Sequence, residues 1–325
     1  MINFEYIKPN SIKAAVEAHT KEKSASFIAG GTNLVDLMKK GVESPTRLID
    51  INGLPLKQIS SDNEGIRIGA LSLNSDLAEH ETVKEKYPLL SMALLAGASP
   101  QLRNMATVGG NILQRTRCLY FYDATLPCNK RNPGSGCAAI GGYNRMHAIF
   151  GTSNQCIAVH PSDMCVALSA LDASVTLNGA KTNRTLTLQQ FLRLPGDEPE
   201  LDNQLQKGEL ITEVSVPSND FNKYHYVKIR DRASYAFALV SVAVAMQTNG
   251  KTIQKIQLAM GGVAHQPWRL TAVEKMLVGK QMNRENFEIA ATLAMEGARG
   301  FGQNNFKIKM GKAAVLEALL KAAGI

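Results

Sequence analysis

Short apolar runs separated by glycine and proline divide the first 220 residues into small strands and helices. Ser11, a residue type that often caps helices, precedes an amphipathic pattern that predicts a helix to about Ala18. The stretch from Asp76 to Ala96 predicts one or two helices, interrupted at Pro88 and ended by Gly97. Strands are predicted at residues 4–6, 47–51, 65–71, 175–179, 184–188 and 209–217, and a further helix at 164–171, which Ser162 and Asp163 would cap.

The last hundred residues follow a different pattern. Three strands are predicted at 224–230, 236–247 and 253–260, followed by helices at 272–277, 284–296 and 311–320. The middle strand is almost entirely apolar, which predicts burial on both faces. Strands followed by helices indicate an α+β fold. The polar, turn-forming stretch 217–222 marks a boundary, so we expect domains at 1–220 and 221–325.

Two glycine pairs lie where apolar segments give way to polar ones. Residues 26–38 predict a strand, a glycine turn at Gly30-Gly31 and a helix, whose first amides would face an anion. A pyrophosphate site and an ordinary tight turn explain this stretch equally well. The pair Gly109-Gly110, in a loop from Thr107 to Asn111, is a second candidate phosphate contact. Neither matches G-x-G-x-x-G, so a Rossmann domain is not predicted.

Four of the five cysteines lie in one segment, between Thr107 and Asp163. The segment is rich in Gly, Pro, Arg and Asn, which favours neither helix nor strand, and loops of this length are usually functional or disordered. In a chain of 325 residues, the crowded thiols favour metal ligation over disulfides. The spacing C-x9-C-x8-C-x18-C by itself leaves zinc, an iron–sulfur cluster and no metal open.

The composition excludes some functions. The apolar content is 45% and the charged content 20%, as in ordinary globular proteins. The formal charge is +8, but the basic residues are scattered and aromatic residues make up only 6%, which does not favour nucleic-acid binding. The charge therefore indicates an acidic partner subunit, an anionic cofactor or a plain solvated surface.

Targeting and membrane signals are not evident. Residues 1–5 have no basic or apolar region typical of a signal peptide, and the longest apolar run, 237–246, is too short to cross a bilayer. The six histidines do not pair at helical spacing with other ligand types, and we find no Ser-His-Asp arrangement or Walker loop. No catalytic residue is predicted in this chain. Residues 230–232 are expected to form a salt-bridged surface or a subunit contact.

Several short motifs, in order along the chain, resemble the FAD-binding subunits of the molybdenum hydroxylases, the xanthine dehydrogenase and carbon monoxide dehydrogenase flavoprotein family. The matching residues are Ala29-Gly30-Gly31-Thr32-Asn33-Leu34, Thr107-Val108-Gly109-Gly110-Asn111, Ser162-Asp163, Gly208-Glu209-Leu210-Ile211 and Lys228. The resemblance covers essentially the whole chain. It implies a two-part FAD-binding domain of the PCMH type, followed by a C-terminal α+β domain of the carbon monoxide dehydrogenase flavoprotein type.

The resemblance also implies which residues hold FAD. The two glycine loops would wrap the pyrophosphate and ribityl chain, and Asp163 would hold a cofactor hydroxyl. Ile211 would lie near the flavin or adenine, and Lys228 near the isoalloxazine, where a cation stabilises an anionic reduced flavin. Without the resemblance, Lys228 would be taken for a surface strand residue. His160 is expected to be structural. The implied set is Ile28, Ala29, Gly30, Gly31, Thr32, Asn33, Leu34, Thr107, Gly109, Gly110, Asn111, Asp163, Ile211 and Lys228.

Within the family, four segments resemble the middle subunits of bacterial periplasmic aldehyde oxidoreductases. They are 115–118, 127–131, 133–137 and 230–238. Such subunits carry a [4Fe-4S] cluster in an insertion, here about 114–158. The resemblance implies that Cys118, Cys128, Cys137 and Cys156 are its ligands. Cys165 lies on an apolar helix face and is expected to be an inert buried thiol.

The resemblance thus implies an electron-transfer subunit of an aldehyde- or xanthine-type oxidoreductase, passing electrons from iron–sulfur clusters through FAD to an external acceptor. Its partners would be a [2Fe-2S] subunit and a molybdopterin subunit, in a heterotrimer that does not insert into a membrane. The complex would be periplasmic, exported on a partner's signal, or cytoplasmic. One alternative is a self-contained FAD reductase of the same fold, such as a UDP-sugar enoyl reductase, although no acid for it is evident. Another is a nucleic-acid-binding iron–sulfur module.

Overall fold

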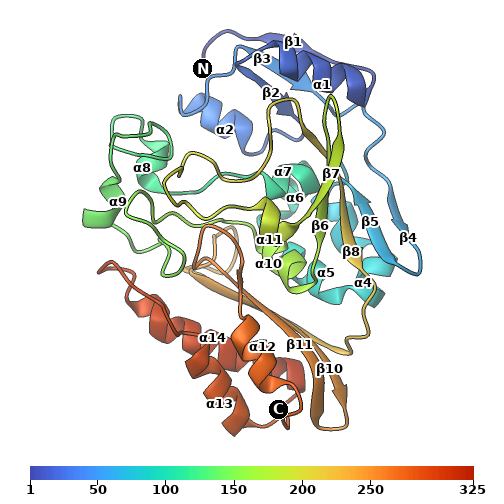
Figure 1. The fold of residues 1–325 in the computed structure, drawn as a ribbon, viewed down its shortest axis with the longest axis vertical. Helices are drawn as coiled ribbons and strands as arrows, with labels where there is room; N and C mark the ends of the chain where they lie inside the picture. The colour runs from blue at the N-terminus through green and yellow to red at the C-terminus, as the bar shows by residue number, and fades with distance from the viewer.

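The structure, a computed structural model, describes residues 1–325 and contains three sheets stacked along its long axis (Figure 1). The N-terminal sheet is small and parallel, with strand order β1-β3-β2. Ser11 caps the following helix as expected, because its hydroxyl accepts from the amide of Ala14 at 3.2 Å. The elements of this layer are β1 (Glu5–Ile7), α1 (Ile12–Lys21), β2 (Ala25–Ile28), α2 (Leu34–Lys39) and β3 (Arg47–Asp50).

The second sheet has five antiparallel strands in the order β4-β5-β8-β6-β7. Alternate residues of β6 are buried and the others partly exposed, as their period-2 sequence predicts. The strands predicted at 175–179 and 184–188 pair as a hairpin, with Asn178 opposite Asn183. The short strand β4 was not predicted. The strands are β4 (Ile59–Ser61), β5 (Gly65–Gly69), β6 (Ser174–Asn178), β7 (Asn183–Thr187) and β8 (Leu210–Pro217).

Short helices cover the inner face of this sheet. The stretch predicted as one or two helices forms three, because His80 and Tyr87 leave helical geometry and Pro88 begins a helix instead of breaking one. Residues 107–111, predicted as a loop, contain a one-turn helix that the Thr107 hydroxyl caps. The helices are α3 (Asn74–Glu79), α4 (Glu81–Lys86), α5 (Pro88–Ala96), α6 (Pro100–Arg103), α7 (Val108–Ile112), α10 (Asp163–Ala170) and α11 (Leu188–Phe191).

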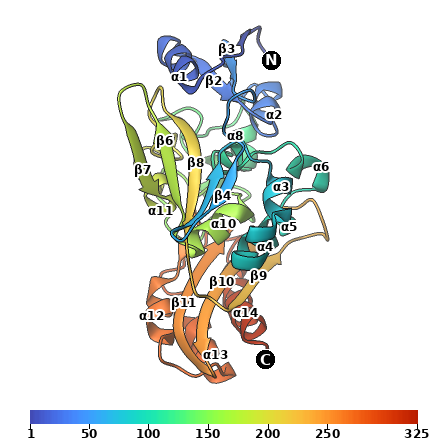
Figure 2. The ribbon, with the colours of Figure 1, turned by 90° about the vertical axis from the view of Figure 1, so that its right-hand side faces the viewer.

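The C-terminal sheet has the order β12-β11-β10-β9, and its helices cover one face (Figure 2). Seven consecutive residues of β10, from Val240 to Met246, are buried, as its apolar sequence predicts. One face packs against α12–α14, and the other shares a core with α5 and α10. The elements are β9 (Lys223–Ile229), β10 (Val240–Asn249), β11 (Thr252–Gly261), β12 (Trp268–Arg269), α12 (Thr271–Leu277), α13 (Arg284–Leu293) and α14 (Phe306–Ala323).

The cysteine-rich segment, residues 114–158, has little regular structure, as predicted, and its helices are the short α8 (Leu119–Tyr122) and α9 (Ala138–Gly141). Side chains of the C-terminal domain hold it in place. Lys307, which is fully buried, donates to the carbonyl of Met146 at 2.9 Å, and Asn304 donates to the carbonyl of Ala148 at 3.0 Å. None of the helices has the length and apolar character needed to span a membrane.

Candidate functional site: two adjoining cavities and a cysteine cluster

The first cavity, of about 330 Å³, lies between the N-terminal sheet and the five-stranded sheet. Both glycine pairs reach it, one from the turn after β2 and the other from α7. The predicted residues that line it are Ile28, Ala29, Gly30, Gly31, Thr32, Asn33, Leu34, Thr107, Gly109, Gly110 and Ile211.

The glycines bring the backbone close to its surroundings. A Cβ atom on Gly30 would overlap the carbonyl oxygen of Met105, so no side chain fits there. Gly31 has a φ of +71°, a left-handed conformation that favours glycine. A Cβ on Gly109 would lie 3.1 Å from that of Ala70. The two turns therefore need glycine for packing and backbone conformation, and this leaves the cavity wall free of side chains.

The second cavity, of about 680 Å³, lies between the five-stranded sheet's helices and the C-terminal sheet. It shares Thr32, Asn33, Ala106 and Gly110 with the first, so the two adjoin at the glycine loops. The predicted residues Asn111, Asp163 and Lys228 line it. All fourteen residues of the implied cofactor set thus lie around these two cavities.

Three buried polar atoms along the cavities lack a hydrogen-bond partner. They are Nδ2 of Asn33, which lines both cavities, and Oδ1 of Asn74 and the hydroxyl of Tyr122, which line the second. Buried polar atoms are rarely left unpaired, and each such atom calls for an explanation. An elongated polar ligand across both cavities would supply the missing partners, which is the chemistry expected of FAD.

A buried ion pair forms one wall of the second cavity. Lys228 Nζ lies 2.8 Å from Asp163 Oδ2, and the two side chains are only 4% and 8% exposed. Lys228 comes from β9 and Asp163 from the start of α10. Lys228 is therefore not the surface strand residue that the sequence alone would suggest. The hydroxyl of Tyr226, which sequence analysis missed, donates to Asp163 Oδ1 at 2.7 Å.

The four predicted ligand cysteines line a single small cavity in the cysteine-rich segment, although they are up to 38 residues apart in sequence. Cys128 and Cys137 form an isolated β-bridge. His147 Nε2 lies 3.1 Å from the sulfur of Cys118, and His265 Nε2 lies 3.3 Å from that of Cys156. Burial raises the pKa of the Cys118 thiol to about 11. No three His, Cys, Asp or Glu side chains in the structure converge as ligands of one metal ion.

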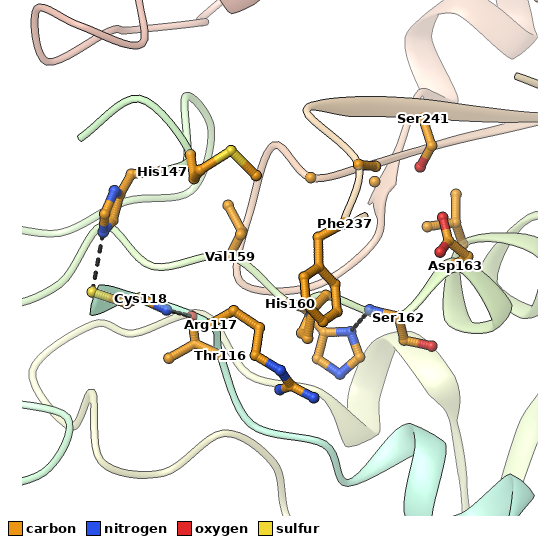
Figure 3. A pocket seen from close by; sticks show the side chains of 16 residues that line it. Thr116, Arg117, Cys118, His147, Val159, His160, Ser162, Asp163, Phe237 and Ser241 are labelled. Atoms are coloured by element: carbon orange, nitrogen blue, oxygen red, sulfur yellow. Dashed lines mark hydrogen bonds between the residues drawn. The ribbon is translucent and has the colours of Figure 1, made fainter. Parts of the chain in front are cut away.

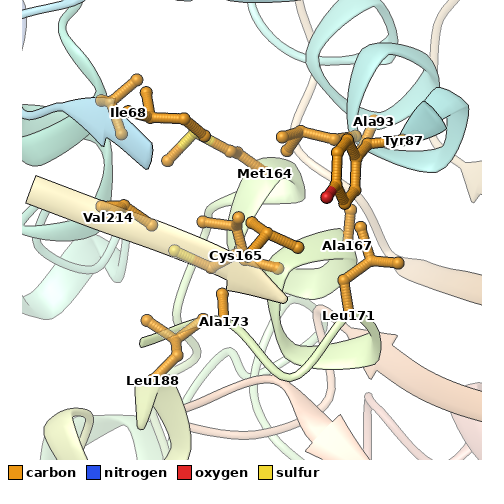
Figure 4. Packing of buried hydrophobic residues seen from close by; sticks show 14 of the residues in the cluster. Ile68, Tyr87, Ala93, Met164, Cys165, Ala167, Leu171, Ala173, Leu188 and Val214 are labelled. Carbon is orange, nitrogen blue, oxygen red and sulfur yellow. The ribbon is translucent and has the colours of Figure 1, made fainter. Parts of the chain in front are cut away.

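Cys165 lies elsewhere, in the largest core cluster, and is fully buried. Figure 4 shows it among apolar side chains that include Val214 and Ala173. Burial raises the pKa of this thiol to about 12. These surroundings are those of the inert thiol that was expected.

A charged network joins the cysteine-rich segment to the loop after α2 and to the loop before β8. The guanidinium of Arg115 lies 2.6 Å from Glu43 and 2.7 Å from Asp202, and Lys130 contacts the other oxygen of Asp202 at 2.5 Å. Burial alone would raise the pKa of Asp202, but Lys130 and Arg115 lower it to about 2. Sequence analysis did not identify this network, because its members are distant along the chain.

A third, small cavity of about 50 Å³ lies between the cysteine cluster and the second cavity (Figure 3). Cys118 lies at one end and Asp163 at the other, with Phe237 between them. Arg117 lines this cavity as well as the second one, and its guanidinium lies 5.0 Å from the centre of the Phe237 ring. His160 is buried with Nε2 3.1 Å from the carbonyl of Ile112, which is the structural role expected.

The 230–232 segment contributes both to the surface and to the second cavity. Asp231 makes a bidentate ion pair with Arg145 of the cysteine-rich segment. Each of its carboxylate oxygens lies 2.8 Å from one guanidinium nitrogen. Arg230 donates to the carbonyl of Ala96 at 3.1 Å. The predicted salt bridge is present, and it fastens the C-terminal domain to the cysteine-rich segment.

Two family models match consecutive parts of the chain. Residues 2–219 match the FAD-binding domain in molybdopterin dehydrogenase, and residues 224–322 match the carbon monoxide dehydrogenase flavoprotein C-terminal domain. The expected fold class is therefore confirmed.

Relatives match over nearly full length. The chain is 48% identical to the aldehyde oxidoreductase FAD-binding subunit PaoB of Escherichia coli (strain K12), over 98% of both chains. It is 31% identical to the glyceraldehyde dehydrogenase medium chain of Sulfolobus acidocaldarius, over 86% of this chain and 83% of that one. A carbon monoxide dehydrogenase structure from Hydrogenophaga pseudoflava superposes with a TM-score of 0.78 and 27% identity, covering 100% of this chain and 99% of the other.

These matches support the subunit and not the self-contained flavin reductase. Their descriptions name FAD, and none of them names an iron–sulfur cluster in this chain. The chain belongs to the FAD-binding medium subunits of the molybdenum-containing aldehyde and carbon monoxide dehydrogenases, oxidoreductases in which a partner subunit oxidises the substrate.

Proposed function

We propose that this chain holds FAD across the two adjoining cavities and a [4Fe-4S] cluster in the cysteine-rich segment. The chain would serve an aldehyde-type oxidoreductase, as the 48% identity to an aldehyde oxidoreductase subunit favours. FAD would supply reversible two-electron chemistry, and the residues of the chain would bind and orient it.

The arrangement around the cavities carries the FAD proposal. The glycine turns leave the backbone without side chains along the first cavity at Gly30 and at Gly110, where the two cavities meet. Asn33 Nδ2 is free to donate to an anionic or carbonyl oxygen. The ammonium of Lys228 has three N–H donors. Two of them donate to the carbonyl of Ala96 and to the carboxylate of Asp163. The third is available to a ligand in the second cavity, where a cation would stabilise negative charge.

The cluster proposal depends on the four thiols around one cavity. A mononuclear zinc site gathers its ligands about 2.3 Å from one ion, whereas a [4Fe-4S] cluster distributes four thiolates around a larger core. Cysteines that surround a common cavity without converging on one point suit the cluster better. Cys118, Cys128, Cys137 and Cys156 are the proposed ligands.

We also propose domains at 1–220 and 221–325 and a heterotrimer with a [2Fe-2S] subunit and a molybdopterin subunit. Such a complex would be periplasmic, on a partner's export signal, or cytoplasmic, and cell fractionation would decide between the two. The basic balance of +8 would help to dock a more acidic partner.

A visible spectrum of the purified complex, with flavin extraction and iron and molybdenum counts, tests these proposals. We expect one FAD per copy of this chain, and four iron atoms beyond the two expected for each [2Fe-2S] cluster. A colourless complex would refute the FAD assignment. Flavin without the additional iron would refute the cluster assignment alone.

A further inference from the structure

Tyr226 belongs to a buried polar group that joins the two halves of the molecule. It lies on β9, two residues before Lys228, so both side chains project from the same face of the strand. Both contact Asp163 at the start of α10. The hydroxyl of Tyr226 donates to one carboxylate oxygen, and the ammonium of Lys228 donates to the other. The carboxylate is thereby held at both oxygens.

Tyr226 is well suited to act as a permanent donor. Burial and the nearby Asp163 raise its pKa well above the ordinary value, so its hydroxyl keeps the proton. Its side chain is otherwise packed in the core shared by the two halves, which fixes the position of the hydroxyl. No other side chain donates to Asp163 apart from Lys228.

Asp163 in turn constrains Lys228. The ammonium is fixed by Asp163 Oδ2 at 2.8 Å and by the carbonyl of Ala96 at 3.0 Å. These two hydrogen bonds determine the direction of the third N–H of the ammonium, which remains free to donate to a ligand in the second cavity. If the carboxylate could rotate, the ammonium could follow it, and the charge presented to the cavity would change.

We propose that Tyr226 is a positioning residue that sets the reduction potential of the cofactor in the second cavity, acting through Asp163 and Lys228. The inference rests on the proposed FAD site. Without the tyrosine hydroxyl, Asp163 loses a donor that disperses its negative charge, and more of that charge offsets Lys228. The cavity would then stabilise a negatively charged reduced flavin less well, and the potential would become more negative.

The test is a redox titration of the FAD-loaded protein, comparing wild type with Tyr226→Phe. We expect unchanged flavin occupancy and a tenfold shift in the ratio of oxidised to reduced flavin at a given potential. For a two-electron couple this is about 30 mV, toward more negative values. Tyr224→Phe is a matched control, because Tyr224 lies on the same strand but donates to the carbonyl of Phe221 at 2.8 Å, outside the group. It should leave the potential unchanged.

A double-mutant cycle separates positioning from a general structural effect. In an Asp163→Asn background, Tyr226→Phe should shift the potential little, because the residue through which it acts is altered. A shift as large as in the wild-type background would overturn the inference, as would a wild-type potential in fully loaded Tyr226→Phe. A wild-type protein without flavin would instead overturn the FAD site itself. Urea unfolding of each variant establishes that it is folded.

Discussion

The backbone amide of Arg115 donates a hydrogen bond to the side-chain oxygen of Asn33, 2.9 Å away and 82 residues earlier. This bond joins the start of the cysteine-rich segment to the first glycine loop. Because it occupies Asn33 Oδ1, the side-chain nitrogen is left as a buried donor on both cavities.

Asn33→Asp should therefore weaken FAD binding with little change in shape. The acceptor for Arg115 would remain, but the free donor would become a carboxylate oxygen that repels an anionic ligand. We expect at least tenfold weaker binding, about 1.4 kcal/mol, in a flavin fluorescence titration of the apoprotein. Asn219→Asp is the control, because it keeps the oxygen that accepts from Tyr224 and lies outside both cavities. Equal affinities of Asn33→Asp and wild type would contradict the assignment.

Gly30→Ala should give a protein with little or no flavin. The added methyl would overlap the Met105 carbonyl, so the loop would have to move away from its place between the cavities. Gly41→Ala is the matched control, because Gly41 has a φ of +68° but open space around it. Its cost would be conformational only, about 1 kcal/mol. Flavin content after gel filtration measures the difference, and full occupancy in a folded Gly30→Ala protein would refute the role of this loop.

Serine substitution of each cysteine should divide the five thiols into two classes. The variants of Cys118, Cys128, Cys137 and Cys156 should lose iron and sulfide. Cys165→Ser should keep both and lose only stability, by about 1–3 kcal/mol, because a hydroxyl would enter an apolar core. Iron and sulfide analysis with urea unfolding gives both readouts. Loss of iron in Cys165→Ser, with iron kept in Cys156→Ser, would show that the ligand set is wrong.

Acid should destabilise the protein partly through Asp202. Its pKa is about 2 in the folded protein against an ordinary value of 3.8, so the folded state favours the ionised form. This contribution is fully present above about pH 4 and is lost as the pH falls toward 2. This difference between the folded and the ordinary pKa corresponds to about 2.5 kcal/mol in the free energy of unfolding.

Asp202→Asn should therefore be less stable than wild type near pH 6. The difference in the free energy of unfolding should shrink as the pH falls toward 2. Urea unfolding across this range measures it. The matched variant Asp62→Asn removes the exposed ion pair with Arg67, and should cost much less stability, because solvent screens this pair. A gap between wild type and Asp202→Asn that is independent of pH would show that the contribution is not electrostatic.

The sequence alone was sufficient for most of the regular structure. Alternation at 209–217 and short apolar stretches at 175–179 and 184–188 predicted strands, and all three are present within a residue of these bounds. The apolar run of β10 predicted burial on both faces, because neither set of its alternate residues is polar enough to face solvent. These features depend on local composition and on solvent, so they can be inferred without knowing the packing partners.

Tertiary structure decided the details that composition could not. Residues 107–111, with two adjacent glycines, favour a loop, yet they form α7 because Thr107 caps the turn and the Gly109 amide bonds to the Ala70 carbonyl at 2.8 Å. Helix α14 begins at Phe306, earlier than predicted, because Lys307 buries its ammonium between two carbonyls of distant loops. Local propensity carries no information on such partners.

The candidate site was predicted as a set of motifs, but its arrangement was not. The glycine pairs and the four cysteines were singled out from the residues themselves, whereas Asp163 and Lys228 were identified only through the resemblance to the flavoprotein family. Tyr226 was not, since its alternation with Tyr224 is that of any amphipathic strand. Its role depends on a carboxylate 63 residues earlier in the sequence, brought within 2.7 Å only when α10 packs on the C-terminal sheet. Residue type and spacing suggested phosphate contacts and a metal site, and the family resemblance suggested a flavin. The contacts that orient Lys228 exist only once the two halves share one core.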